Sequence, residues 1–327
     1  MADVELVHVM RGEEIDCVHR GHVVMVNSIG EQIFERGDGS ATVFMRSLAK
    51  PFQALAVVES GAMEKFGFTS AELALMCGSH NGTSEQTQIL EGVMGKIGVQ
   101  ISALQCGTSS PIDRKTAEQL TVSGQKPNAL HHPCSGKHLG MLAICKARGW
   151  DTEGYSHAHH PVQRYITDVV YTALRVDDYV SNLALDGCGV PTYGLPLGNI
   201  ALGFALCASA ARDNESTKQS VMRAMQEHPV LMSGQRRMDT ALMLATNGRV
   251  IAKDGTEGIF GCAVPDKGVG LAIKISDGSS RAIMPVVTKV LRDHGFISVE
   301  EADQLTAQFP LDIKIHTGER AGEMRVI

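Results

Sequence analysis

The distribution of strand and helix signals along the chain constrains its fold more than any other feature of the sequence. Segments rich in strand-forming residues occur near the start of the chain and again near its end. They are Leu6 to Val9, Asp16 to Val26, Ile33 to Glu35, Arg249 to Ala252, Gly258 to Val264 and Val269 to Ile275. We therefore expect one mostly antiparallel sheet built from both ends of the chain, flanked by helices and interrupted by a helical insertion, in an α/β (α+β) fold.

The middle of the chain reads as helix and loop. Capping boxes at Thr69–Glu72 and Thr83–Gln86 predict the beginnings of two helices. No repeat, low-complexity tract or Pro/Ser-rich linker divides the 327 residues. We expect a single unit over residues 1–327, with a sheet portion at about 1–60 and 245–327 and a helical portion at about 61–244.

A Ser-x-x-Lys motif stands where the first helix begins. Ser47 and Lys50 lie three residues apart, and Pro51 belongs in the first turn of the helix, where its missing N–H costs least. Residues at this spacing share a helix face, so the lysine amine can reach the serine hydroxyl. A neutral lysine that takes the serine proton would create a nucleophile for acyl transfer. The alternative is a serine at the helix N-terminus beside an exposed lysine.

Two further motifs follow the first in a recognisable order. Ser79-His80-Asn81 lies in a loop between predicted helices, and Lys253-Asp254-Gly255 leaves a late strand. Together with Ser47 and Lys50, they reproduce the three-motif layout of serine β-lactamases and penicillin-binding proteins. They would supply a second serine for proton relay and a second lysine as a cation. His80 and Asp254 depart from the usual residues of that layout, so the pocket need not accept a β-lactam.

Cysteines in two polar, Gly-containing segments form a second candidate site. Cys134 and Lys137 lie in one segment, and Cys188 follows Asp186 in the other. Two thiolates and a deprotonated amine would suit Zn²⁺. The alternative is that the first segment is a tight helix-entry loop and Cys188 a turn residue. Spacing alone leaves both interpretations open, since the usual CxxC and HxxxH zinc signatures are absent.

Composition excludes several classes of function. A formal net charge of −6 and a pI of about 6.1 argue against a nucleic-acid binder. No apolar stretch reaches the ~20 residues that a membrane span needs. No Gly-rich phosphate loop is present, so no nucleotide is expected. The acidic beginning of the chain is unlike a signal peptide, and we expect a cytoplasmic protein.

Four long strings make the sequence resemble a known family, the Rhizobium-type (class 3) L-asparaginases, also called the asparaginase II family. They are Arg46–Leu55, Ala74–Asn81, Cys134–Leu142 and Asp186–Thr192. The resemblance extends over essentially the whole chain. It implies a fold like that of serine β-lactamases and glutaminases, a homodimer, and hydrolysis of L-asparagine to L-aspartate and ammonia.

The same resemblance implies roles for individual residues. Two Ser-Lys tandems would pair Ser47 with Lys50 and Ser79 with Lys253. A zinc site would use Cys134, Lys137 and Cys188. Since asparagine is a zwitterion, Asp186 is a candidate for its α-ammonium and Arg46 or Lys253 for its α-carboxylate. Further substrate-binding candidates lie within the matching strings. They are Asn81 and His138.

We therefore predict an amidohydrolase in which Ser47 is the nucleophile and Lys50 the base. Two alternatives remain. One is a β-lactamase-like acyl-serine amidase that acts on another amide or ester. The other is a catalytically inert zinc-binding protein on the same scaffold. Ammonia release from L-asparagine, measured with and without a chelator, separates these hypotheses.

Overall fold

A computed structural model describes residues 2–176, 182–210 and 217–327 of the chain. The chain divides into two compact units. Unit 1 comprises residues 1–48, 195–209 and 238–327, and unit 2 comprises residues 49–194 and 210–237.

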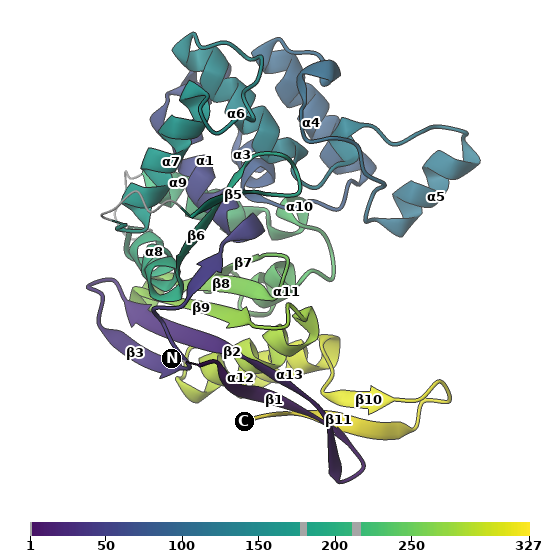
Figure 1. The fold of residues 1–327 in the computed structure, drawn as a ribbon. Coiled ribbons are helices and arrows are strands. Elements are labelled where there is room, and N and C mark those ends of the chain that lie inside the picture. The colour runs from purple at the N-terminus through teal and green to yellow at the C-terminus, as the bar shows by residue number, and fades with distance from the viewer. Residues whose placement is uncertain (1, 177–181, 211–216) are drawn as a thin grey trace. The chain divides into compact units, whose positions relative to one another are not determined.

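The centre of unit 1 is an eight-stranded sheet with the order β10-β11-β1-β2-β9-β8-β7, and β3 pairs with β2 beside this path. Its strands are β1 (Val4–Arg11), β2 (Glu14–Asn27), β3 (Gln32–Arg36), β7 (Ile251–Asp254), β8 (Ile259–Val264), β9 (Val269–Ile275), β10 (Asp312–Lys314) and β11 (Arg320–Val326). All the described pairings in this sheet are antiparallel. Strands from both ends of the chain meet where Val9 lies opposite Met324 (Figure 1). The predicted sheet is confirmed.

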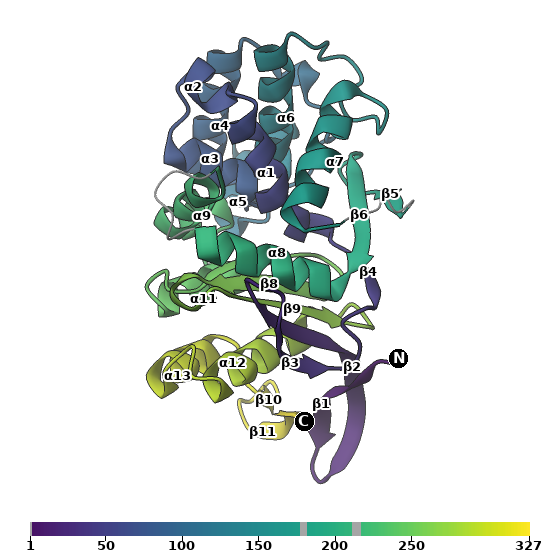
Figure 2. The same ribbon diagram turned by 90° about the vertical axis from the view of Figure 1, so that its left-hand side faces the viewer.

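Helices cover both faces of this sheet, as Figures 1 and 2 show. They are α8 (Leu197–Ala210), α11 (Met238–Ala245), α12 (Ile283–Asp293) and α13 (Val299–Gln308). On one face, α8 lies so close to β9 that a Cβ at Gly270 would come within 2.1 Å of the Ala201 carbonyl oxygen. On the other face, α12 contacts β9 and β11 and packs against α13.

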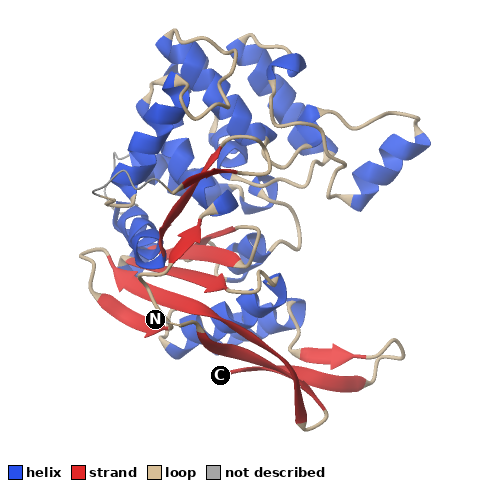
Figure 3. Ribbon diagram, in the orientation of Figure 1, coloured by secondary structure: helices blue, strands red, loops and turns tan. Residues whose placement is uncertain are grey.

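Unit 2 is mainly helical (Figure 3). Its helices are α1 (Lys50–Glu59), α2 (Ala62–Phe66), α3 (Ser70–Cys77), α4 (Ser84–Ile97), α5 (Arg114–Val122), α6 (Ser135–Arg148), α7 (Pro161–Ala173), α9 (Thr217–Glu227) and α10 (Pro229–Met232). At its core, α3 is buried from Glu72 to Cys77 and packs against α1 and α6. The α6 backbone reaches α3 closely because Gly136 has no side chain, and a Cβ there would lie 2.2 Å from the Leu75 carbonyl oxygen.

Local signals in the sequence predict the helix beginnings well. Both capping boxes are present: Thr69 with Glu72 begins α3, and Thr83 with Gln86 begins α4. The beginning of α1 differs from the prediction. Residues Arg46–Ala49 form a 3₁₀ turn, and the α-helix proper starts at Lys50. Ser47 therefore lies in the turn that leads into α1.

Two pairs of short strands carried no clear signal in the sequence. In unit 2, β5 (Leu183–Leu185) pairs with β6 (Pro191–Pro196) and holds the turn that contains Asp186 and Cys188. In unit 1, β10 and β11 form a hairpin with mostly exposed or half-buried residues. Among the described residues, no helix is both long and apolar enough to cross a membrane.

Candidate active site

A buried lysine and a buried serine meet in unit 2. Lys50 begins α1 and Ser79 follows the C-terminus of α3, so the packing of α1 on α3 brings them together. Nζ of Lys50 lies 2.7 Å from Oγ of Ser79 and 3.3 Å from the Pro133 carbonyl oxygen. The lysine is completely buried and the serine is 5% exposed. A hydrogen bond of this kind lets a proton pass between an amine and a hydroxyl.

A chain of hydrogen bonds fixes the loop that carries Ser79. The next residue, His80, is completely buried, and its Nδ1 accepts a bond from the Gly82 amide at 3.1 Å. Its Nε2 therefore donates to Oγ of Ser135 at 2.8 Å, and this hydroxyl donates to the Leu130 carbonyl at 3.0 Å. Burial, followed by the charge of Lys50, lowers the pKa of His80 to about 3. At neutral pH, His80 is thus uncharged and holds the loop through its two hydrogen bonds.

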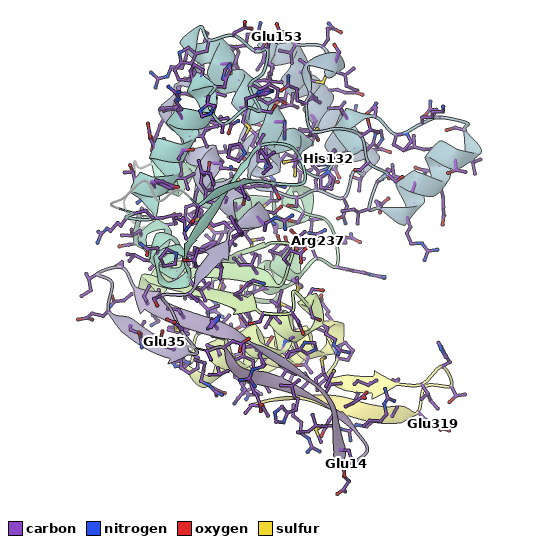
Figure 4. All side chains as sticks on the ribbon, in the orientation of Figure 1. Glu14, Glu35, His132, Glu153, Arg237 and Glu319 are labelled. Carbon is purple, nitrogen blue, oxygen red and sulfur yellow. The ribbon has the colours of Figure 1, made fainter. Side chains whose placement is uncertain are left out.

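The cysteines and the lysine of the second motif form one buried cluster in unit 2. Cys134 immediately precedes α6, Lys137 lies in its first turn, and Cys188 lies in the turn between β5 and β6. Nζ of Lys137 is 3.1 Å from Sγ of Cys188 and 3.8 Å from Oδ2 of Asp186. The backbone amide of Cys134 donates to Nδ1 of His132, a residue labelled in Figure 4.

The cluster separates the protonation states of its two thiols. A hydrogen bond from Cys188, assisted by the charges of Lys50 and Lys137, holds the pKa of Cys134 well below its usual range. The same hydrogen bond, with burial, raises the pKa of Cys188. Burial opposes the charge of Lys137, but the pKa of this lysine is raised overall by Cys134, Cys188 and Asp186. Without a bound ion, a thiolate at Cys134 thus faces an ammonium at Lys137.

Among the described residues of unit 2, five buried side-chain atoms have no hydrogen-bond partner, on Gln53, Asn81, Ser109, His138 and Gln163. Two of them, Oδ1 of Asn81 and Nε2 of His138, belong to predicted substrate-binding residues. The Tyr155 hydroxyl accepts from the Gln105 amide at 2.9 Å, so it donates to Nδ1 of His138 at 2.6 Å. Burial and the charge of Lys137 lower the pKa of His138 well below its ordinary value. The free Nε2 of neutral His138 therefore carries the proton and is a donor, whereas Oδ1 of Asn81 is an acceptor.

Unit 1 holds the second lysine between two carboxylates. Lys253 lies on β7, and its side chain is completely buried. Its Nζ donates to Oδ2 of Asp239 at 3.0 Å, to the Asp254 carbonyl at 2.8 Å, and to Oδ1 of Asp254. Asp239 is itself completely buried in the first turn of α11, where its Oδ1 accepts from the Thr240 amide at 2.9 Å. Negative charges at this distance stabilise the charged form of a lysine.

The predicted nucleophile also belongs to unit 1. Ser47 is partly exposed, three residues before Lys50 in the chain, and lies in the 3₁₀ turn Arg46–Ala49. Arg46 has φ of 49°, a left-handed conformation that is uncommon for a residue with a side chain and often occurs at functional sites. Its Nη1 lies 3.9 Å from Oε1 of Glu257.

The structure thus brings together part of the predicted site. In unit 2, Lys50 contacts Ser79, and the side chains of Lys137, Cys188 and Asp186 lie together beside Cys134. Ser47, Arg46 and Lys253 belong to unit 1, so the predicted tandem of Ser79 with Lys253 stays a prediction.

Sequence reasoning missed residues that position the site. Asp239, which holds Lys253, lies fourteen residues before it, and no motif connects the two. The Tyr155 that orients His138 likewise carries no signal in the sequence. His80 alone was marked, as the central residue of Ser79-His80-Asn81, but its role in holding the loop required the structure.

Comparisons with known proteins give one family. The model of the family described as L-asparaginase II matches residues 7–326. Comparison of the sequence with curated proteins finds no match.

Solved structures give remote likenesses. A candidate β-lactamase from Bacteroides dorei is 14% identical, with 83% of this chain and 93% of that chain covered and a TM-score of 0.43. A class C β-lactamase variant is 15% identical, with 88% of this chain and 92% of that chain covered and a TM-score of 0.42. A protein named Mglu is 11% identical, with 84% of this chain and 67% of that chain covered and a TM-score of 0.37. At these identities and TM-scores, the likenesses carry no conclusion about activity.

Proposed function

Because the chain belongs to the L-asparaginase II family, an amidohydrolase family, we propose that it hydrolyses L-asparagine to L-aspartate and ammonia by a serine–lysine mechanism. The observation that carries the mechanism is the 2.7 Å hydrogen bond between Nζ of Lys50 and Oγ of Ser79, both buried and both within the family match. In this proposal Ser47 attacks the side-chain amide carbon, and its proton passes to Lys50 directly or through Ser79. Lys50 then protonates the leaving ammonia, and water releases aspartate from the acyl-enzyme.

The surroundings of the two lysines support different roles for them. The amine of Lys50 is completely buried and donates to the Ser79 hydroxyl, a group that can relay a proton to it. Lys253 is equally buried but has carboxylates of Asp239 and Asp254 against its amine. We therefore assign the base to Lys50. Lys253 is a fixed cation that stabilises negative charge on the substrate or on the developing oxyanion.

The unpartnered buried atoms of Asn81 and His138 support recognition of a small zwitterion. Oδ1 of Asn81 is a buried acceptor, suited to an ammonium or an amide N–H of the substrate. Nε2 of His138 is a buried donor, suited to a carboxylate or carbonyl oxygen. Each atom left without a partner costs stability, so occupation by the substrate returns binding energy. Asp186 for the α-ammonium, with Arg46 or Lys253 for the α-carboxylate, completes the proposal.

The cluster at Cys134 fits a zinc ion through its donor atoms. Within the described part of the chain, no three His, Cys, Asp or Glu side chains are placed to hold a metal ion, so the set needs the amine of Lys137. A thiolate at Cys134, with Cys188 and Lys137 beside it, is a soft donor set that suits Zn²⁺ and not Mg²⁺ or Ca²⁺. When bound, zinc would supply a Lewis acid that orients or polarises the substrate. Lys137 must lose its proton to bind the ion, so binding releases protons.

The test is ammonia release from L-asparagine by purified protein, with and without a chelator, beside L-glutamine and a chromogenic β-lactam. Ammonia from asparagine supports the proposal. Hydrolysis of the β-lactam or of another amide, with asparagine untouched, would favour the acyl-serine amidase. Bound zinc with no hydrolysis would favour an inert zinc-binding protein. The homodimer and the cytoplasmic location stay predictions.

A further inference from the structure

One segment of unit 2 covers the loop that carries Ser79 and Asn81. This covering segment, His228–Gly234, includes the short helix α10, which packs against α3. Nε2 of His228 hydrogen-bonds with Oγ of Ser70 at 2.8 Å, and Nε2 of Gln86 donates to the Leu231 carbonyl at 2.8 Å. Because Ser70 begins α3 and Gln86 lies in the first turn of α4, these bonds fix the covering segment on both sides of the loop.

Two glycines let the covering segment lie directly on the loop. A Cβ at Gly78 would come within 1.8 Å of the Met232 carbonyl oxygen, so the two backbones touch. A Cβ at Gly234 would lie 2.1 Å from Nδ2 of Asn81 and 2.5 Å from its Cγ. Gly234 also has φ of 134°, a conformation that residues with side chains rarely adopt. The amide group of Asn81 therefore occupies the space that a side chain at position 234 would fill.

The main chain at Asn81 is also fixed by a hydrogen bond. Its backbone carbonyl accepts from the Asp113 amide at 2.9 Å, so the main chain at this point is fixed. Gly234 faces Nδ2 and Cγ of the side chain, and Oδ1 is absent from its nearest atoms. This Oδ1 is buried and has no hydrogen-bond partner. A buried acceptor without a protein partner takes its donor from a ligand or from water, and Asn81 lies two residues from Ser79, beside the proposed site of the substrate.

We infer that Gly234 is a positioning residue: its bare Cα sets the Asn81 amide so that Oδ1 is presented to the substrate. The inference rests on the proposed function and adds a specificity element to it. Without room at position 234, the amide must rotate or withdraw, and the acceptor moves away from the substrate. Gly234 touches no reacting atom and acts only through Asn81.

A double-mutant cycle tests this inference. The variants are Gly234→Ala, Asn81→Ala and the double substitution, each assayed for kcat and KM with L-asparagine. Loss of a hydrogen bond to a charged group predicts that either single change lowers kcat/KM about 10- to 100-fold, mainly through KM. Because Asn81→Ala removes the clashing amide, we expect Gly234→Ala to cause no further loss of kcat/KM in the double variant.

A matched control separates clash from backbone strain. Gly98 also has a positive φ, of 66°, but a Cβ there would meet nothing within 4 Å. Gly98→Ala should therefore leave the kinetic constants unchanged. In thermal unfolding, Gly234→Ala should lower the melting temperature more than Gly98→Ala, and adding Asn81→Ala should reduce that excess to the part that backbone strain at φ of 134° contributes. This second readout needs no substrate.

The outcomes are distinguishable. Wild-type protein that releases no ammonia from asparagine would overturn the proposed function, whereas melting temperatures would still report on the contact. Kinetic effects that add in the double variant, or a Gly234→Ala variant with wild-type KM, would overturn the positioning role of Gly234. Coupling in melting temperature without coupling in KM would make the contact purely structural and would overturn the inference too.

Discussion

Replacing His80 by glutamine should remove a defined part of the acid sensitivity of folding. Burial, with the charge of Lys50, lowers the pKa of His80 from 6.5 to about 3 in the folded protein. Below pH 6.5 the unfolded chain takes up a proton that the folded protein does not bind until about pH 3. Stability from neutral His80 is therefore fully present above pH 6.5 and is lost as the pH falls through this window.

The size of the effect follows from the same pKa. At pH 5 the solution lies about 1.5 units below the ordinary histidine value, and each unit corresponds to about 1.4 kcal/mol, so the loss is about 2 kcal/mol. Glutamine does not titrate, and its amide N–H can replace the bond that Nε2 of His80 donates to Ser135. The free energy of unfolding, from urea titrations at pH 7.5 and pH 5.0, should thus fall by about 2 kcal/mol more in wild type than in His80→Gln.

The control for this experiment is a histidine on the surface of the same unit. His159 is exposed, and His159→Gln should keep the full pH difference of the wild type. If the free energy of unfolding fell equally between pH 7.5 and pH 5.0 in wild type and in His80→Gln, the reasoning would be refuted. Such a result would mean that His80 has the same pKa in the folded and unfolded states. Since His80 lies between Ser79 and Asn81, its protonation would also displace the loop that carries both residues.

Three further predictions concern the chemistry. Ser47→Ala should abolish asparagine hydrolysis with the fold intact by circular dichroism, and residual activity above ~1% of wild type would contradict the assignment. Lys50→Arg should lose as much activity as Lys50→Ala, because a guanidinium stays protonated. The control Lys96→Arg, at a lysine paired with Glu72, should stay active. An active Lys50→Arg variant would show that another residue is the base. Elemental analysis should find about one zinc per chain, and this zinc should be lost in Cys134→Ser and below neutral pH. Loss of zinc should change KM more than kcat. Active enzyme without metal would show that the cysteines are structural thiols.

The parts of the fold that sequence could predict are those set by local chemistry. The capping box at Thr69–Glu72 acts within one helical turn, so its four residues specify the beginning of α3 by themselves. Continuous apolar residues likewise specify the second half of β2 and most of β9, because β2 is buried from Gly21 to Val26 and β9 along most of its length. The hairpin β10–β11 gave no such signal because its residues are mostly exposed or half-buried. Its strands depend on their neighbours in the sheet.

The residues of the candidate site also divide into those with a local signal in the sequence and those without one. The motif strings marked Ser47, Lys50, Ser79 and the Cys134 cluster because the residue types themselves suggest the chemistry. Partners supplied by distant segments had no local signal. The covering segment over Asn81 depends on Gly234, one glycine among 34 in the sequence, and only its distance to the Asn81 amide distinguishes it.

The roles of the two lysines show most directly why sequence could not complete the mechanism. Lys50 and Lys253 are both completely buried, and each lies in a short motif compatible with either a base or a cation. Acyl transfer through a serine needs one of each: a neutral amine to take the proton, and a fixed positive charge for the substrate or the oxyanion. The difference lies in what packs against each amine. The Ser79 hydroxyl, which can relay a proton, hydrogen-bonds to Lys50, and the carboxylates of Asp239 and Asp254 hydrogen-bond to Lys253. Asp239 reaches its lysine only because α11 packs against β7, so the division of roles arises from tertiary packing.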